Sequence, residues 1–274
     1  MRRTIGMIVP TVDNFFFSSL VREVGSILRE KGYRMIVCDS SNGVETEKES
    51  FRMLSELGVA GVVCISGLNA FTEDLLPESI PLVWVDRRPF SKRGIPWVAN
   101  DDQAAMEMAT DALIKRGCRN ILLLPGFLAE HQESPRVEGY RRSLEKHGLP
   151  CRQAYILNRS GERSTELEAE ALVSRVIHEG NEVDGIITSS DRAAFGAITA
   201  LRSGGLYIPE DVKLISFDNS VYASLAAPGI TCLDRNPRQL AQKACETLEG
   251  LIEGKSVEMA NVVEVSLIKR DSIR

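Results

Sequence analysis

The sequence predicts an α/β protein built from parallel β-sheets that are covered by helices on both faces. Two observations lead to this prediction. First, short and continuously apolar runs alternate with longer stretches of helical periodicity from one end of the chain to the other. Such runs are typical of parallel strands that are buried on both faces. Second, residues 184–219 contain one complete strand–helix–strand unit in which both ends of the helix are marked.

Each element can be placed in order along the chain. Strands are expected at residues 5–9, 35–38, 62–65, 82–85, 121–124, 186–188 and 214–217. Helices are expected at residues 16–31, 46–57, 104–116, 136–147, 165–178 and 238–253, with one more inside residues 184–219. The first helix places Leu20, Val24 and Leu28 on one face and ends at Gly32. In the 184–219 unit, a glycine pair ends the helix and Pro209 prevents its resumption.

The alternation of strands and helices restarts near Asn100, which divides the chain into two halves of similar length. No Pro/Gly/Ser-rich linker separates the halves, so direct strand-to-strand crossings are expected. We therefore predict two doubly wound parallel-sheet lobes. The N-terminal lobe is expected to contain residues 1–98 with 235–260, and the C-terminal lobe residues 99–234 with 261–274.

Composition and charge restrict the class of protein. The 274 residues are 43% hydrophobic, which suffices for a sizeable core. No apolar run approaches the roughly 18–20 residues that a membrane-spanning helix needs. The opening residues MRRTIGMIVP are interpreted as a first strand, because their apolar part is too short for a signal peptide. The net charge of -5 argues against nucleic-acid binding by this chain itself, since phosphate contacts need a basic face.

The cysteines indicate a reducing environment and no metal site. None of the six lies in a CxxC spacing, and no histidine is close to metal-ligand spacing. Cys38, Cys64 and Cys232 lie inside apolar runs, where a thiol behaves as a small hydrophobe. Buried, reduced thiols and a cytoplasmic location are therefore expected, with disulfides or a metal as the alternative.

Polar residues stand where several predicted strands end. Parallel strands place their carboxyl ends at one edge of the sheet, where ligands bind, so Ser190, Asp191 and Asp218 are expected to face one crevice. Ser66 and Asp86 follow two other strands in the same way. Each of these residues could instead cap a helix or form a turn. A ligand role is most favoured for the two strand-end carboxylates at positions 86 and 218, because a carboxylate can accept two adjacent hydroxyl protons of a sugar.

An arginine and an aromatic run complete the candidate site. Arg136 begins a predicted helix after a loop, where its guanidinium could bind a carboxylate or two hydroxyls. The alternative is a solvated arginine on a helix face. The run Phe15-Phe16-Phe17 opens the first predicted helix. At least one ring must face the core, and another could stack on a ligand, although core packing alone stays open.

Motifs for catalysis are missing from the sequence. It contains no GxSxG elbow, no GxxxxGK[ST] loop, and no GxGxxG after the first strand. We therefore expect no cofactor and no enzymatic activity. An α/β enzyme of another class would need a catalytic group that the sequence does not show.

Six blocks of the chain form a recognisable series: IGMIVPTVDNFFFSSLVREVGSILREKGYRMIVCDS, VDRRP, DDQAAMEMATDALIKRGCRNILLLPG, SPRVEGYRRSLEKHGLP, SSDRAAFGAITALRSGGLYIPEDVKLISFDN and VSLIKRDSIR. In this order they resemble the effector-binding core of LacI/GalR-type transcriptional regulators. Together they span essentially the whole chain. The resemblance implies the type I periplasmic-binding-protein-like fold, with a ligand cleft between its two lobes.

The resemblance also implies a set of effector contacts. Carried over by position, these contacts are Asn14, Phe16, Phe17, Ser66, Asp86, Arg136, Ser190, Asp218 and Arg235. Three positions depart from the family pattern: Ser190 and Asp102 stand where asparagine is common, and Arg235 where glutamine is frequent. Residues 157–161 also lack the aromatic residue often found there. These departures bear on the identity of the effector and leave the fold unchanged.

The function that the resemblance implies is that of a ligand-sensing and dimerisation core. The parent protein would be a cytoplasmic repressor that responds to a small effector, with a sugar as the expected class. A homodimer is expected, and operator DNA is expected to bind only through a helix-turn-helix headpiece absent from this chain. Met1-Arg2-Arg3 directly precede the first strand, which we interpret as truncation. The alternative is a sugar-binding protein of a transport system.

Overall fold

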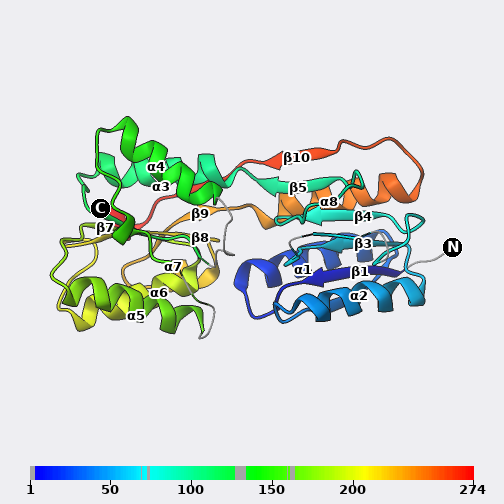
Figure 1. Cartoon of the computed structure of the whole chain (residues 1–274), viewed down its shortest axis with the longest axis horizontal. Coiled ribbons are helices and arrows are strands. Elements are labelled where there is room, and N and C mark those ends of the chain that lie inside the picture. The colour runs from blue at the N-terminus through cyan, green and yellow to red at the C-terminus, as the bar shows by residue number, and fades with distance from the viewer. Residues whose placement is uncertain (1–3, 69, 73–74, 127–133, 159, 161–163) are drawn as a thin grey trace. The chain divides into compact units, whose positions relative to one another are not determined.

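The computed structural model describes residues 4–68, 70–72, 75–126, 134–158, 160 and 164–274 (Figure 1). The chain divides into two compact units. The first comprises the residues up to Asn100 together with Asn236–Glu264, and the second comprises Asp101–Arg235 together with Val265–Arg274. Each unit is therefore assembled from segments that lie far apart in the sequence.

The first unit contains a six-stranded sheet in the order β10-β5-β4-β3-β1-β2, with every pair of neighbours parallel. Its strands are β1 (Thr4–Val9), β2 (Arg34–Asp39), β3 (Gly61–Cys64), β4 (Leu82–Val85), β5 (Trp97–Asn100) and β10 (Ala260–Val263). Its helices are α1 (Phe15–Glu30), α2 (Val44–Leu57) and α8 (Pro237–Ile252). α1 and α8 pack on one face of the sheet and α2 on the other.

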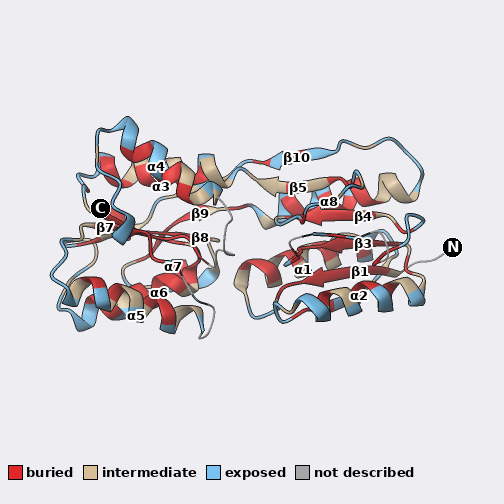
Figure 2. Cartoon of the chain, viewed as in Figure 1, coloured by how far each residue is buried: buried red, intermediate tan, exposed pale blue. Residues whose placement is uncertain are grey.

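Strand β1 shows why the apolar runs are continuous. Met7 packs in one core with Leu20 of α1 and Leu248 of α8. The next residue, Ile8, packs in the opposite core with Phe51 of α2. Successive side chains of a strand point to opposite faces, so a strand that is covered on both sides must be apolar at every position. The buried strands and half-buried helices of Figure 2 follow this rule.

The second unit contains a five-stranded sheet in the order β11-β9-β8-β7-β6. The strands are β6 (Ile121–Leu124), β7 (Gly185–Thr188), β8 (Lys213–Phe217), β9 (Thr231–Asp234) and β11 (Ser266–Ile268), of which only β11 is antiparallel to its neighbour within the described chain. The helices are α3 (Asp102–Lys115), α4 (Pro135–Lys146), α5 (Thr165–His178), α6 (Asp191–Ser203) and the short α7 (Val221–Leu225). Two 3-10 turns, Gln153–Tyr155 and Asp271–Ile273, complete the unit.

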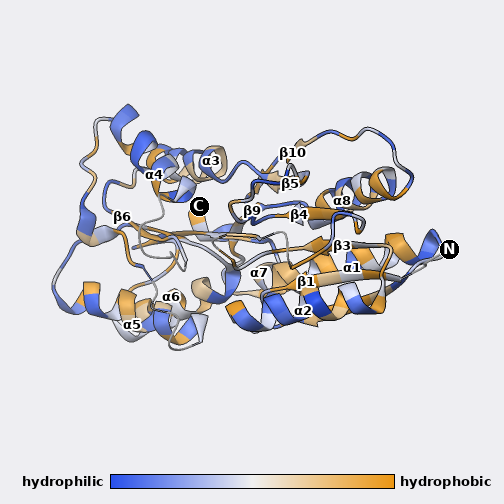
Figure 3. Ribbon diagram, turned by 45° about the vertical axis from the view of Figure 1, so that its right-hand side comes forward, coloured by the Kyte–Doolittle hydropathy of each residue, from blue (hydrophilic) through white to orange (hydrophobic). Residues whose placement is uncertain are grey.

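Two helix pairs cover the faces of this second sheet. α3 and α4 pack over Leu123 and Ile187, and α5 and α6 pack over Leu122 and Ile186. The helices show one hydrophobic and one hydrophilic side (Figure 3). Each pair is held close by a glycine: a Cβ on Gly196 of α6 would lie 2.1 Å from the carbonyl oxygen of Glu166 in α5.

The observed unit boundaries differ from the expected ones by a few residues. β10 pairs with β5, with Asn261 opposite Val98, so the first unit continues to Glu264 instead of ending at residue 260. Arg235 follows β9 directly and belongs to the second unit, not to the N-terminal lobe in which the sequence prediction placed it. All seven expected runs coincide with strands to within one residue. β5, β9, β10, β11 and α7 were not predicted.

The ends of the helices have local causes. The side chain of Asn14 accepts hydrogen bonds from the backbone N–H groups of Phe16 (2.9 Å) and Phe17 (3.1 Å), which starts α1. Asp101 caps α3 by accepting from the N–H of Ala104 at 2.9 Å. These caps satisfy backbone donors that have no partner within the helix.

Among the described residues, no helix is both long and apolar enough to cross a membrane. The six cysteines are free, and all except Cys151 are buried. Burial raises the pKa of the Cys118 thiol to about 11 and that of Cys245 to about 12, so these thiols stay protonated at neutral pH.

Candidate functional site

Two aspartates that follow strands adopt an unusual backbone conformation. Asp86, after β4, has φ +64°, and Asp218, after β8, has φ +93°. This left-handed region is uncommon for residues other than glycine, and it recurs at binding sites. These are the two strand-end carboxylates for which the sequence most favoured a ligand role.

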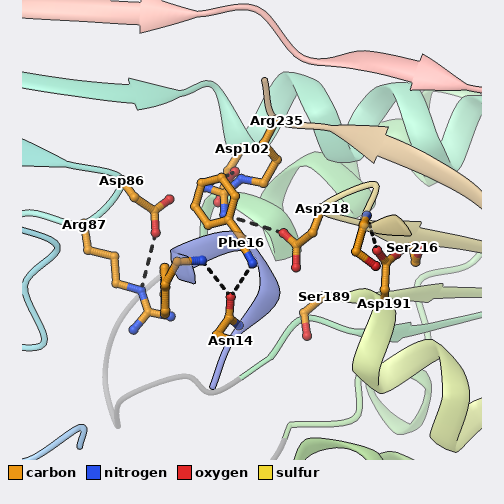
Figure 4. A network of polar contacts seen from close by, with 12 residues as sticks. Asn14, Phe16, Asp86, Arg87, Asp102, Ser189, Asp191, Ser216, Asp218 and Arg235 are labelled. Atoms are coloured by element: carbon orange, nitrogen blue, oxygen red, sulfur yellow. Dashed lines mark hydrogen bonds and ion pairs between the residues drawn. The ribbon is translucent and has the colours of Figure 1, made fainter. Parts of the chain in front are cut away.

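In the second unit, two arginines and two aspartates form a chain of charge contacts, of which Asp102, Arg235 and Asp218 are shown in Figure 4. Nε of Arg136 donates to Oδ2 of Asp102 at 2.9 Å. Nη2 of Arg235 lies 4.0 Å from Oδ1 of Asp102, and Nη1 of Arg235 lies 3.9 Å from Oδ1 of Asp218. The order is therefore Arg136, Asp102, Arg235, Asp218, and the formal charges of the four side chains sum to zero.

Arg136 is also held by two other groups of the second unit. Its Nη1 donates to the backbone carbonyl of Ser189 at 3.3 Å, and its Cζ lies 4.2 Å from the ring centroid of Phe217. The stacked guanidinium is fixed in direction because the aromatic face attracts the cation while the carbonyl and carboxylate orient its N–H groups. The sequence placed Arg136, Asp218 and Arg235 in the site, and the structure brings these three together.

Sequence analysis named Asp102 only as a departure from the family pattern and did not include it among the expected effector contacts. Its neighbour Asp101 already caps α3, so a second acid at position 102 was not needed for the helix start. The sequence offered one indication of such a role: Asp101 and Asp102 are adjacent acids, and only one of them is needed to cap the helix. Asp102 contacts both arginines and therefore links Arg136 to Arg235.

Ser190 and Asp191 have structural partners. The hydroxyl of Ser190 accepts from the N–H of Ala193 at 3.3 Å and caps α6. Asp191 is fully buried, accepts from the Ser216 hydroxyl, and accepts from the N–H of Ser220 at 2.6 Å. The expectation that Asp191 faces the ligand edge is therefore wrong: this carboxylate ties α6 to β8 inside the unit. For Ser190, contact with an effector stays a prediction.

In the first unit, the predicted ligand-binding residues already contact other residues of the same unit. Phe16 and Phe17 are only 2% and 5% exposed and belong to the core beneath α1, which favours the core interpretation of both rings. Asn14 is the cap of α1. Nε of Arg87 lies 3.9 Å from Oδ2 of Asp86, and the Arg87 guanidinium lies 5.5 Å from the Phe17 ring centroid.

Ser66 is bound to a buried glutamate. Its hydroxyl donates to Oε1 of Glu47 at 2.5 Å and accepts from the N–H of Leu68 at 3.0 Å. Oε2 of Glu47 accepts from the N–H of Gly67 at 2.7 Å. Burial raises the pKa of Glu47, and these hydrogen bonds only partly offset that rise. The Ser66 proton is therefore used within the unit, which leaves one lone pair of its oxygen for a ligand.

No group of three His, Cys, Asp or Glu side chains that could hold a metal occurs within the described part of the chain. The chemistry that the second unit offers is that of recognition, with fixed donors on two arginines and acceptors on two carboxylates.

The comparisons with known proteins agree on one family. Residues 110–273 match the model of the periplasmic binding protein-like domain. The chain is 28% identical over 277 residues to the HTH-type transcriptional repressor PurR of Vibrio cholerae, covering 99% of this chain and 81% of that protein. It is 30% identical over 253 residues to the HTH-type transcriptional regulator MalR of Streptomyces coelicolor, covering 89% and 72%.

A solved structure agrees with these relatives. The crystal structure of a periplasmic binding protein/LacI transcriptional regulator from Alkaliphilus metalliredigens, complexed with D-xylulofuranose, is 27% identical, with a TM-score of 0.86 and coverage of 98% of both chains. The relatives are named as transcription regulators and not as enzymes. The family model, the sequence relatives and this structure agree along the chain, and the protein belongs to the LacI family of transcriptional regulators, of which this chain is the effector-binding core.

Proposed function

We propose that this chain senses a small, uncharged sugar for a regulator that represses transcription. The observation that carries the proposal is the charge-balanced chain of Arg136, Asp102, Arg235 and Asp218 in the second unit. It offers donors and acceptors at fixed positions without a net charge. A sugar has the matching chemistry, because each hydroxyl both donates and accepts.

The charge balance favours a neutral effector over an anionic one. Two arginines alone would attract a phosphate or a carboxylate. Here both guanidinium groups lie within 4.0 Å of aspartate oxygens, which would repel an anionic ligand. Asp218 would accept two neighbouring hydroxyls, and Arg136 would donate to a third oxygen. The sugar in the related complex from Alkaliphilus metalliredigens supports the ligand class.

In this proposal the first unit contributes fewer contacts. Asp86, with its left-handed backbone, is the strongest candidate there, and Asn14, Phe16, Phe17 and Ser66 are weaker ones because the contacts described above occupy them. The affinity would then depend mainly on the second unit, with Ser190 as a further expected contact.

A homodimer is part of the proposal. α7 exposes Leu225 (74%), Val221 (62%) and Tyr222 (48%). Clustered exposed apolar side chains mark interaction surfaces, and a two-fold dimer buries the same patch on both copies. Operator DNA would be bound by a headpiece outside these residues, as the HTH-type names of the relatives suggest.

A ligand panel followed by calorimetry tests the effector class. Neutral pentoses and hexoses, their phosphates, and purine bases would be compared for the rise in melting temperature that they cause. We expect neutral sugars to raise it and the phosphates of the same sugars to have little effect, because ligand binding stabilises only the folded state. Stabilisation by the phosphates alone would contradict the neutral effector.

Light scattering on the purified chain and on Leu225→Glu tests the assembly. We expect a dimer for the unchanged chain and a larger monomer fraction for the variant, because a buried carboxylate opposes the apolar contact. A monomer at high concentration would favour the transport-protein alternative instead.

A further inference from the structure

The first unit carries a pocket that shares no residue with the strand-end set described above. Its volume is about 420 Å³, within the range of roughly 300–1,000 Å³ of small-molecule sites. It lies beside β4 and β5, and its walls include Arg88, Arg93, Phe90, Trp97 and Met259. The walls thus combine two cations with aromatic and apolar side chains.

The charged side chains that line this pocket, among the described residues, are all positive. Two arginines line it, and none of the described lining residues is acidic. The nearby acids Glu78 and Glu258 are exposed and do not line it. Like charges in one pocket repel each other, and a bound anion would remove that cost. This positive pocket is unexpected in a chain whose net charge is -5, so surface composition alone does not account for it.

The guanidinium group of Arg88 is positioned for a ligand. Its Cζ lies 4.0 Å from the ring centroid of Trp97. Among the described residues it has no acidic or carbonyl partner within hydrogen-bond distance. Stacking on a ring occupies the face of the guanidinium and leaves the N–H groups at its edge, which is the arrangement that binds carboxylate or phosphate with two parallel hydrogen bonds.

Arg93 supplies a second, rigid cation. Its Nη1 donates to the carbonyl of Leu76 and its Nη2 to the carbonyl of Glu78, each at 3.2 Å. Its own N–H donates to the Ser91 hydroxyl at 3.1 Å. Carbonyl oxygens orient the guanidinium without neutralising it. Each Nη carries two hydrogens, so donors remain for a ligand.

The apolar wall indicates a ligand with a flat hydrophobic body. Phe90 is 71% exposed and Met259 is 47% exposed, although both line the pocket. An exposed aromatic ring beside a fixed arginine gives an anion with an aromatic body two kinds of contact at once.

We propose that this pocket is a second ligand site, which binds a small aromatic anion through Arg88 and Arg93 and holds its ring against Phe90 and Met259. The anionic group is a carboxylate or a phosphate. This ligand differs in charge and in shape from the neutral sugar proposed as effector, so the chain would respond to two compounds of different chemistry.

The test uses two anions, each with a neutral counterpart, on the whole chain. Salicylate is compared with salicylamide, and adenosine monophosphate with adenosine, by calorimetry or by ligand-observed NMR. We expect one of the anions to bind at least roughly tenfold more tightly than its neutral counterpart. Binding of salicylate would identify an aromatic carboxylate site, and binding of the monophosphate an aromatic phosphate site. Equal binding of charged and neutral compounds, or no binding of either anion at millimolar concentration, would overturn the proposal.

Variants locate the binding and separate it from the effector site. Arg88→Gln should weaken anion binding by roughly tenfold or more, and Phe90→Ala, which removes an exposed ring without disturbing the core, should weaken it as well. Arg202→Gln, an exposed arginine of α6 with the same loss of charge, and Asp218→Ala should leave it unchanged. If Asp218→Ala abolished anion binding and Arg88→Gln left it unchanged, the anion would bind at the effector residues. The proposal of a second site would then be wrong.

Discussion

The strand ends of the two units use their polar residues differently. In the first unit, Ser66 is bound to the buried Glu47, and Asn14 caps α1. In the second unit, Ser190 and Asp191 also serve the fold, but Arg136, Asp102, Arg235 and Asp218 contact one another in a chain. Groups that cap or fill a unit are needed for its stability, whereas the chain of opposite charges offers donors and acceptors that a ligand can use. We therefore expect stability effects in the first unit and affinity effects in the second.

The largest expected effect is on effector affinity in Asp218→Ala. Removing the acceptor of two hydroxyls should weaken binding of the sugar found in the panel by roughly 100-fold, since each charge-assisted hydrogen bond contributes about 1.5–3 kcal/mol. The melting temperature should change by only a few degrees. Calorimetry measures the sugar affinity, and thermal unfolding measures the melting temperature.

The matched control is Asp39→Ala in the first unit. Asp39 also follows a strand, but it accepts from the N–H groups of Val12 (2.9 Å) and Ser41 (2.7 Å). This variant should lose stability and keep its affinity. If Asp218→Ala retained full affinity while Asp39→Ala lost it, the comparison between the units would be reversed.

A smaller effect is expected on selectivity in Asp102→Asn. The amide oxygen can still accept from Arg136, but the four-residue chain gains one positive charge. The preference for a neutral sugar over its phosphate should narrow by roughly tenfold, a change of about 1.4 kcal/mol in the difference between the two binding free energies. Competition titrations with the two ligands measure the ratio. An unchanged ratio would show that Asp102 does not set the charge preference.

Ser66→Ala should act mainly on stability. The variant leaves Oε1 of the buried Glu47 without its hydroxyl donor, which should cost about 1–3 kcal/mol of unfolding free energy. Sugar affinity should fall by less than about threefold, since only one lone pair of the serine is available to a ligand. Urea unfolding and calorimetry test the two parts. A large loss of affinity with unchanged stability would make Ser66 a ligand residue.

The smallest expected effects are on the pH dependence of stability, and they have opposite signs in the two units. In the second unit, burial raises the pKa of Asp111, but hydrogen bonds from Lys146, Ser143 and His147 outweigh burial and lower it below 3.8. Its stabilising contribution is present above the unfolded pKa and is lost as pH falls through the lower folded value. Asp111→Asn should therefore reduce the slope of acid destabilisation below about pH 4.

Glu47 in the first unit should behave in the opposite way. Its folded pKa is raised above 4.5, so the folded state binds more protons and the contribution is lost as pH rises through the folded pKa. Glu47→Gln should remove this decline in stability. Unfolding free energies measured between pH 3 and 7 for both variants test the signs, and slopes of equal sign would refute the contrast.

Much of the fold could be predicted from the sequence, because two-sided burial leaves a continuous apolar run that periodicity detects. Of the strands that were not predicted, β5, β10 and β11 lack this pattern, whereas β9 is buried at three of its four positions but has a polar threonine at its start. β10 alternates exposed and buried residues at the edge of its sheet, and β11 has three residues. For the candidate site, strand ends followed by Asp or Ser identified the sheet edge. This strand-end pattern could not show that Asp191 is buried against β8 while Asp218 belongs to the candidate site.

The sequence by itself determined the type and order of the main elements, their burial on both faces, and the family resemblance that the comparisons confirm. These properties depend on local periodicity and on residue type at chain-adjacent positions. Only the tertiary structure decided which polar residues meet. Asp102 and Arg235 are 133 residues apart in sequence and approach to 4.0 Å because α3 begins where β9 ends. Contacts of this kind depend on register and topology, which no local pattern of residues encodes.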